Sequence, residues 1–224
     1  MPDAHHLLLF VAAGLLLNLT PGPDVLCVTT QGLRAGFRAG AAAALGVAAG
    51  CFVHIVAAAA GVGALLAASG QAFLVLKLVG AAYLLWVGLR LLRHPGGVDI
   101  KSIATNDRIT PAFGVKSFKD AFLNGFWTNA LNPKVALFFL AFVPQFIAPD
   151  AADKTRAFIA LGLLFNANGL LVNLGWAAMA AWMRHGLGRA GHRLERATRA
   201  LDRAAGVLFV AFGIKLAGAA GPAS

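Results

Sequence analysis

The chain has 224 residues, of which 59% are hydrophobic and 12% are charged, and its formal net charge is +10. Soluble domains usually carry about 25% charged residues, so this composition excludes an ordinary soluble protein and indicates an integral membrane protein. The basic excess does not indicate nucleic-acid binding, because Lys and Arg gather between apolar stretches, as they do beside membrane spans.

Six apolar stretches are long enough to cross a membrane, because one helical crossing requires about 20 apolar residues. In chain order, the expected spans are residues 7–31, 39–66, 72–92, 121–147, 157–183 and 204–220. These runs are continuous, whereas the strands of a membrane barrel alternate polar with apolar residues. We therefore predict an all-α integral membrane protein with six transmembrane helices. Five spans are the alternative, because the last stretch is short and follows a basic run.

The first expected span is interrupted by Thr20, Pro21, Gly22, Pro23 and Asp24. A Thr followed by Pro is typical of a helix start, because its side-chain oxygen can cap free backbone amides and proline has no amide to leave unpaired. We expect a broken helix whose second half begins at membrane depth. Such positive helix ends bind anionic ligands in transporters.

The second and third spans are joined by residues 67–71, which are small and polar and predict a turn. Within the second span, Gly46 and Gly50 have the spacing of a closely packed helix face. His54 lies one helical turn further along. A histidine can exchange protons near neutral pH, which would suit a proton-coupled transporter. The alternative is that His54 only forms a hydrogen bond to a neighbouring helix.

The fourth span repeats the interruption, with Asn132 before Pro133 and Lys134. Asn132 is expected to cap the helix that begins at Pro133. A cation near a helix N-terminus opposes the helix dipole by about 0.3–1 kcal/mol, so Lys134 indicates a compensating anion such as a substrate carboxylate. The alternative is that Lys134 extends to the membrane interface.

Asp24 is the only acidic residue in any expected span, and carboxylates inside membranes are usually functional. It could hold a substrate ammonium group, carry a proton, or pair with Lys134. Its alternative role is to cap its own helix electrostatically. Asn168 belongs to a set of amides in the fifth span and near the breaks, some of which we expect to line the transport pathway. Hydrogen bonding between helices is the alternative for each of them.

The basic residues lie mainly in three connections, after the first, third and fifth spans. The positive-inside rule predicts that this side is cytoplasmic and that both termini face outward. The stretch 184–203 has arginines at helical spacing and leucines on another face, so we expect it to lie on anionic lipid.

A similar tetrapeptide ends the third and sixth spans, residues 88–91 and 213–216. Together with the two breaks, it favours an inverted repeat of three helices each, with chance similarity as the alternative. The expected division of the single transporter domain, 1–224, is a first repeat over 1–93, a cytoplasmic loop over 94–120 and a second repeat over 121–224.

Three motifs, in residues 19–24, 76–84 and 131–134, resemble the LysE/RhtB family of amino-acid exporters, and the similarity continues through 139–149. The resemblance implies a secondary transporter that exports an amino acid or a derivative from a bacterial cytoplasm, through the inner membrane, by proton exchange. It does not identify the amino acid. Small-residue helix faces would permit a homodimer.

Enzymes, metal centres and cofactors have no supporting motif, since Cys27 and Cys51 lack the C-x-x-C spacing and no His-Glu-x-x-His pattern occurs. A metal or other ion exporter and a non-transporting receptor or assembly protein are the alternative functions. The residues expected to bind substrate are Thr20, Pro21, Gly22, Pro23, Asp24, Asn132, Pro133, Lys134 and Asn168. Asp24 and His54 are the candidates for proton coupling.

Overall fold

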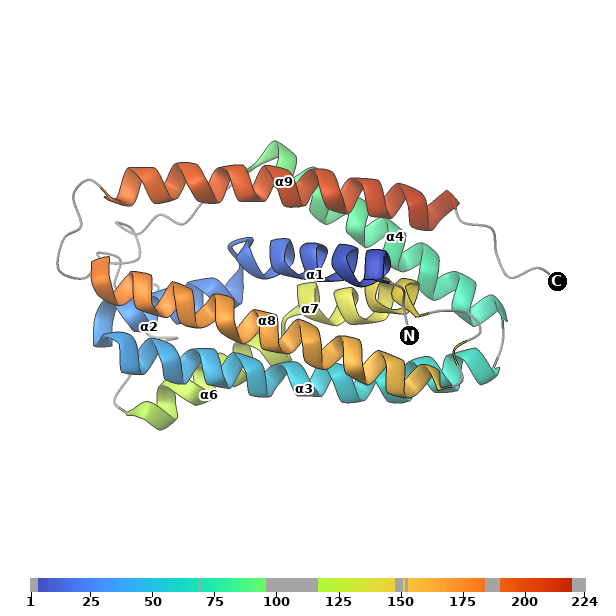
Figure 1. Ribbon diagram of the computed structural model, residues 1–224, viewed down its shortest axis with the longest axis horizontal. Helices are drawn as coiled ribbons and strands as arrows, with labels where there is room; N and C mark the ends of the chain where they lie inside the picture. The colour runs from blue at the N-terminus through green and yellow to red at the C-terminus, as the bar shows by residue number, and fades with distance from the viewer. Residues whose placement is uncertain are drawn as a thin grey trace.

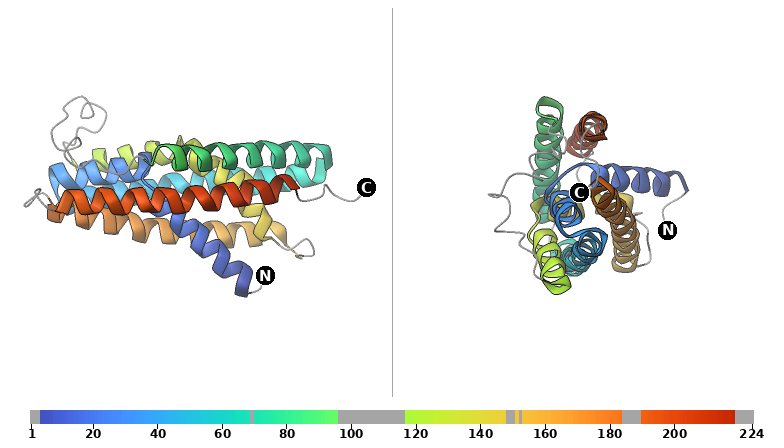
Figure 2. Two further views of the ribbon diagram at one scale, coloured as in Figure 1. Left: turned by 90° about the horizontal axis from the view of Figure 1, so that it is seen from above. Right: turned by 90° about the vertical axis from the view of Figure 1, so that its left-hand side faces the viewer.

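The computed structural model describes residues 4–68, 70–95, 117–147, 151, 153–183 and 190–218, and the elements in these ranges are helical. They form an elongated bundle (Figure 1), from which α1 leans outward (Figure 2). The elements are α1 (Ala4–Leu19), α2 (Pro23–Ala35), α3 (Phe37–Ala68), α4 (Gly70–Arg93), α6 (Phe118–Ala130), α7 (Pro133–Leu137), the π-helical η3 (Phe138–Phe142), the 3-10 helix η4 (Val143–Phe146), α8 (Lys154–Met183) and α9 (Ala190–Gly218).

Two described helices are long and apolar enough to cross a membrane by themselves, Phe37–Gly61 within α3 and Lys154–Met183. Two bent pairs also qualify: Leu7–Leu19 with Pro23–Ala35, bent by 53°, and Phe118–Ala130 with Pro133–Phe146, bent by 46°. These pairs confirm that the first and fourth expected spans are broken. Helices α4 and α9 occupy the third and sixth expected spans but are not among these candidates, so six crossings stay a prediction.

Helix α9 corrects the prediction for the basic stretch. The sixth span was expected to begin at residue 204 after a separate segment on the lipid surface, but α9 is continuous from Ala190 to Gly218. Residues 184–189 lie outside the described residues. The helix continues because no proline interrupts the stretch, and two of its polar side chains, Thr198 and Asp202, are buried against the protein at 0% and 2% exposure.

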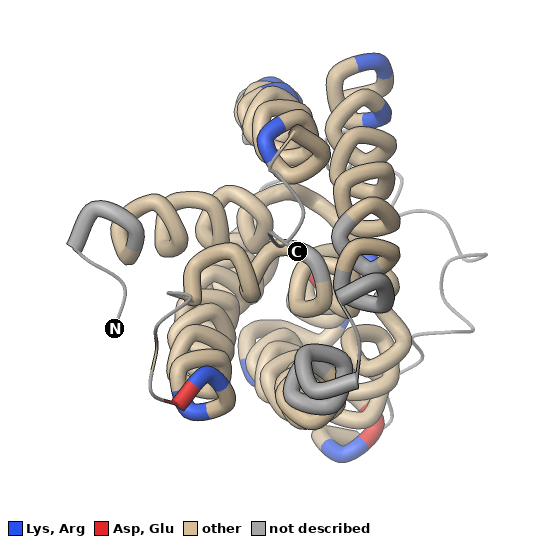
Figure 3. The backbone as a smooth tube through the Cα atoms, turned by 90° about the vertical axis from the view of Figure 1, so that its right-hand side faces the viewer, with Lys and Arg blue, Asp and Glu red and all other residues tan. Residues whose placement is uncertain are grey.

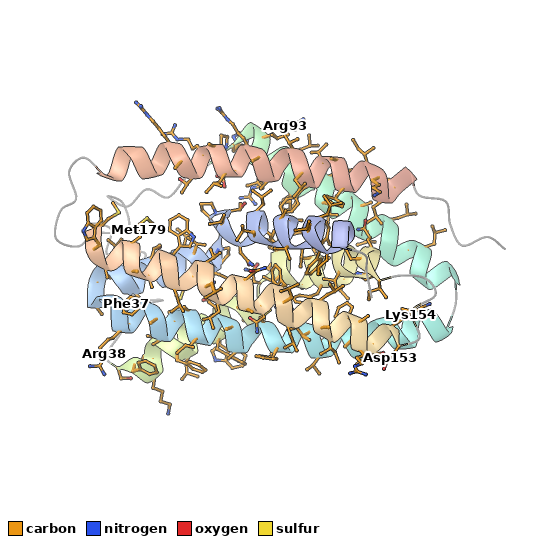
Figure 4. All side chains as sticks on the ribbon, in the orientation of Figure 1. Phe37, Arg38, Arg93, Asp153, Lys154 and Met179 are labelled. Atoms are coloured by element: carbon orange, nitrogen blue, oxygen red, sulfur yellow. The ribbon has the colours of Figure 1, made fainter. Side chains whose placement is uncertain are left out.

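Few charges lie along the bundle, as the mostly tan tube of Figure 3 shows. Arg38 lies at one end of the bundle, whereas Asp153 and Lys154 lie at the opposite end (Figure 4). This separation agrees with charges that flank a membrane-spanning region. The expected connecting loop lies mostly outside the described residues, which begin again at Ser117, the N-cap of α6.

Small residues bring α3 and α6 into close contact along their length. A side chain at Gly46 would collide with the backbone carbonyl of Phe122, and one at Gly50 would meet the carbonyl of Phe126. The predicted close packing at Gly46 and Gly50 is therefore confirmed. Because α6 leads directly into the second break, this contact fixes where that break lies.

We expect Gly46→Val to prevent normal assembly of the bundle. Its side chain would push against backbone that cannot move aside, and such overpacking usually costs about 1–3 kcal/mol or more. The variant should show a lower unfolding temperature in detergent and less protein in the membrane. Gly61→Val is the matched control in the same helix, because nothing lies within 4 Å of the added Cβ position. Equal stability of both variants would contradict the packing argument.

Candidate functional site

The two helix breaks meet at the middle of the bundle, where residues from both line one small cavity. Thr20, Gly22 and Asp24 come from the first break, and Asn132 and Lys134 come from the second. We call this the central cavity. The remaining lining residues are Leu17, Asn18, Val25, Val135, Phe165 and Asn173. Five of the nine residues predicted to bind substrate line this cavity, whereas Pro21, Pro23, Pro133 and Asn168 do not.

At the first break, the cap differs from the prediction. Gly22 is the N-cap of α2 and no side chain caps it, whereas the Thr20 hydroxyl donates 2.6 Å back to the carbonyl of Leu16 in α1. The expectation that Thr20 caps the second half-helix is therefore wrong, because Pro21 and Pro23 delay the helix start. The first amides of a helix have no partner within it. Asp24 and Val25, in the first turn of α2, both line the central cavity.

At the second break, the predicted cap is confirmed. The side-chain oxygen of Asn132 accepts a 3.0 Å hydrogen bond from the backbone amide of Lys134. Its side-chain nitrogen donates at 3.1 Å to Oδ2 of Asp24. A single capping side chain thus connects the two breaks.

Asp24 is held by amides of the other half of the chain. Its Oδ2 accepts from Nδ2 of Asn129 at 2.9 Å as well as from Asn132. Its Oδ1 is buried without a hydrogen-bond partner. Asn129 belongs to the set of amides near the breaks, some of which we expected to line the transport pathway; it lies near the end of α6, three residues before Asn132. The carboxylate therefore has one oxygen fixed and one available.

Lys134 points into the centre of the protein and not toward an interface. Its Nζ donates to the backbone carbonyls of Leu17 at 3.0 Å and Thr20 at 3.2 Å, at the C-terminal end of α1. That end carries the negative pole of the helix dipole, which stabilises a cation. Within the described residues Lys134 and Asp24 form no direct salt bridge, although both line the central cavity. These two hydrogen bonds of Lys134 therefore connect the second half of the chain to the C-terminal end of α1.

His54 lies beside this network and connects to it through Asn129. Its Nε2 is 2.8 Å from the backbone carbonyl of Asn129, and its ring stacks on Phe139 with centroids 6.4 Å apart. It is 8% exposed. His54 thus makes a hydrogen bond to a neighbouring helix, as the alternative interpretation of this residue expected. Its partner, Asn129, also donates a hydrogen bond to Asp24.

The central cavity is small, with a volume of about 20 Å³. That is enough for about one water molecule. Asn168 does not line it, whereas Asn173, from the same helix, does. Oδ1 of Asn173 is buried without a hydrogen-bond partner, like Oδ1 of Asp24. Two residues that line the cavity thus each carry a buried oxygen without a hydrogen-bond partner in the protein.

Aromatic rings pack tightly beside the central cavity, on the side of α7 and η3. Phe165, which lines the cavity, stacks on Phe138 with centroids 4.4 Å apart, and Phe138 contacts Phe142 at 4.9 Å. Phe142 and Phe146 continue the contact to Phe212 of α9. The backbone here departs from α-helix geometry, which is common where helices serve a function. This cluster fills the space between the cavity and η4.

The chain matches the family described as LysE type translocator over residues 15–219. It is 30% identical over 214 residues to a homoserine/homoserine lactone efflux protein of Salmonella typhi, covering 94% of this chain and 95% of that protein. It is also 27% identical over 208 residues to a leucine efflux protein of Salmonella choleraesuis, covering 93% and 92%. An uncharacterized membrane protein of Vibrio cholerae is 31% identical over 215 residues, covering 96% and 98%. No solved structure matches the chain.

Proposed function

The chain belongs to the LysE-type translocator family, and on that premise we propose that it exports an amino acid or a close derivative by exchange for protons. As a member of this family it is a multi-pass membrane transporter and not an enzyme. The bacterial relatives favour the inner membrane as its location. The observation that supports the proposal best is the half-satisfied carboxylate of Asp24, beside Lys134 and an open helix N-terminus.

The free ends of an amino acid match the groups left unsatisfied in the central cavity. A buried acceptor without a donor is costly, so Oδ1 of Asp24 and Oδ1 of Asn173 favour a ligand with several N–H groups. A substrate ammonium group supplies three. The substrate carboxylate would bind the amides that begin α2 and the Nζ of Lys134, as anions do at helix N-termini.

The rest of the cavity lining favours a short or moderately apolar side chain. Leu17, Val25, Val135 and Phe165 supply its apolar surface. Relatives named for homoserine and for leucine efflux fit this range of side chains. We therefore include both amino acids, and homoserine lactone, among the first substrates to test.

Transport requires the centre to open, because small-molecule sites usually enclose about 300–1,000 Å³ and the central cavity has a volume of only about 20 Å³. We propose that two inverted three-helix repeats, 1–93 and 121–224, rock against each other around the breaks. Lys134 would then leave the carbonyls of α1 for the substrate carboxylate. A homodimer is compatible with this mechanism but not required by it.

Proton exchange would act through Asp24. A proton and a substrate ammonium group cannot both occupy its available oxygen, so each would displace the other, which is the requirement for antiport. His54 is placed to relay the proton, because it contacts Asn129 and Asn129 binds Asp24. The residues proposed to bind substrate are Thr20, Pro21, Gly22, Pro23, Asp24, Asn132, Pro133, Lys134 and Asn168, to which the geometry adds Asn129 and Asn173.

The proposal is tested by measuring export from bacteria that lack their own exporters. Cells loaded with single amino acids by feeding dipeptides should release one class of amino acid faster when the chain is expressed. Cells that do not express the chain serve as the control. Release no faster than this control for every amino acid, with release of metal ions instead, would replace the proposal by an ion exporter. No release of either would favour a receptor or assembly protein.

A further inference from the structure

A cavity much larger than the central one lies where α1, η4 and α9 meet, beside the helix that leans outward from the bundle (Figure 2). Its volume is about 380 Å³, within the range of about 300–1,000 Å³ that is usual for small-molecule sites. We call it the lateral groove. Most of its lining is apolar: Leu9 of α1, Phe146 of η4, and Ala211, Phe212 and Leu216 of α9. Leu9 and Ala211 are exposed, so the groove reaches the protein surface.

The inner wall of the lateral groove is held by aromatic contacts. Phe212 packs on Phe142 with ring centroids 4.6 Å apart, and Phe146 packs on Phe142 at 4.9 Å and on Phe10 of α1 at 5.3 Å. Phe146 and Leu216 are 5% and 6% exposed. The apolar surface of the groove is therefore fixed by the packing of the bundle.

One charged residue, Lys215, lines the groove. It lies in the last turn of α9, is exposed, and is the only charged side chain in the sequence after Arg203. Among the described residues that line the groove none is acidic, and the other polar residue, Gln145, is uncharged. A cation also interacts favourably with the C-terminal end of its own helix, but that interaction needs no apolar groove beside it. Charge and lining together favour a ligand with an anionic group and an apolar chain.

The position of the groove favours a lipid as this ligand. The C-terminal end of α9 lies at the same end of the bundle as Asp153 and Lys154 (Figures 1 and 4), where charges flank the membrane-spanning region. A free amino acid fits less well, because its ammonium group would find no carboxylate in the lining. The same argument disfavours a zwitterionic phospholipid, whose headgroup cation would lie beside Lys215 without an acidic partner.

We propose that the lateral groove binds an anionic phospholipid such as phosphatidylglycerol. One acyl chain lies along Leu9, Phe146 and Phe212, and the phosphate lies at Lys215. The site is separate from the central cavity, and the proposal does not depend on which substrate is exported. A lipid that binds the folded protein should also raise its unfolding temperature by mass action.

The test uses the full chain purified in detergent, with dioleoyl phosphatidylglycerol or dioleoyl phosphatidylcholine added. Native mass spectrometry counts the bound lipid, and thermal unfolding measures its effect. The wild type should be half-saturated at a roughly fivefold lower ratio of phosphatidylglycerol than of phosphatidylcholine, as expected for one basic residue beside an anionic headgroup. Lys215→Gln should bind both lipids equally. Lys154→Gln removes the same charge from the same end of the bundle and should keep the preference.

A second pair of variants tests the apolar part of the groove. Ala211→Trp fills the groove and should raise the half-saturating ratio of both lipids by roughly tenfold, because the acyl chain loses its place. Val207→Trp is the matched control, since Val207 lies one turn earlier on α9, is 61% exposed and does not line the groove. It should bind both lipids like the wild type.

Equal binding of the two lipids by the wild type, an unchanged preference in Lys215→Gln, or wild-type binding by Ala211→Trp would overturn the proposal. Tighter binding of free oleate than of phosphatidylglycerol would replace the phospholipid by a fatty acid. A dimer without bound lipid, lost in Ala211→Trp, would assign the groove to a second copy of the chain. Lipid binding as predicted, together with no amino-acid export, would contradict the proposed function alone.

Discussion

Replacing Asp24 by Asn is expected to abolish amino-acid export while the protein still inserts into the membrane. The substitution keeps the size of the side chain, and one oxygen remains to accept from Asn129 and Asn132. It removes the charge proposed to hold the substrate ammonium group. A hydrogen bond to a charged group contributes about 1.5–3 kcal/mol, so binding should weaken roughly 10- to 150-fold. Loss of the proposed proton carrier should stop exchange altogether.

The measurement is the initial rate of export at matched membrane expression, compared with Asp153→Asn. That control changes the same chemical group at an exposed position at the start of α8, and it should export like the wild type. Wild-type export by Asp24→Asn would remove Asp24 from the mechanism. Loss of both variants from the membrane would show that expression, and not transport, had been measured.

Replacing Lys134 by Ala should reduce export about as strongly as Asp24→Asn does. It should lower the stability of the protein more than Asp24→Asn does. The variant loses two hydrogen bonds from a charged group to the end of α1 and removes the cation that shares the central cavity with Asp24. A hydrogen bond to a charged group contributes about 1.5–3 kcal/mol, so the loss of two should lower the stability substantially. We therefore expect no measurable export and a clearly lower unfolding temperature in detergent.

The origin of that stability loss can be checked with a second substitution. If uncompensated carboxylates cause it, Asp24→Asn added to Lys134→Ala should raise the unfolding temperature above that of Lys134→Ala alone. Lys154→Ala, at the exposed start of α8, should unfold and export like the wild type. A further decrease in the double variant would contradict the electrostatic account of Lys134.

The sequence was sufficient to predict both helix breaks, because a capping residue followed by proline is a local signal. At Asn132 the local rule held in detail. At Thr20 it failed, since Pro21 and Pro23 move the start of α2 beyond the reach of the Thr20 hydroxyl, which binds back to Leu16 instead. Local rules thus located the breaks, but they did not determine which side chain caps them.

Contacts between the two halves could not be predicted from single residues. That Asn129 binds Asp24, and that Lys134 binds the carbonyls of α1, depends on how the breaks meet in space. The inward position of Asp202 could not be predicted for a different reason. It precedes the apolar run used to define the sixth span, and hydropathy does not show that the same helix begins earlier and turns this residue inward.

The fourth span was also expected to continue as a regular helix to residue 147. In the structure it changes to a π-helix and then a 3-10 helix, Phe138–Phe142 and Val143–Phe146. Pro144 has no amide to donate to the preceding turn, and the amide of Val143 reaches the carbonyl of Phe138. The proline is visible in the sequence, so this departure could have been predicted.

The most direct test of the central claim, that an amino acid binds at Asp24 between the two breaks, is exchange in liposomes containing only the purified protein. Vesicles are loaded with the amino acid identified in the export assay, and entry of the labelled amino acid from outside is followed. We predict saturable exchange by the wild type and none by Asp24→Asn, with Asp153→Asn exchanging normally. Equal exchange by wild type and Asp24→Asn would show that the amino acid crosses the protein elsewhere.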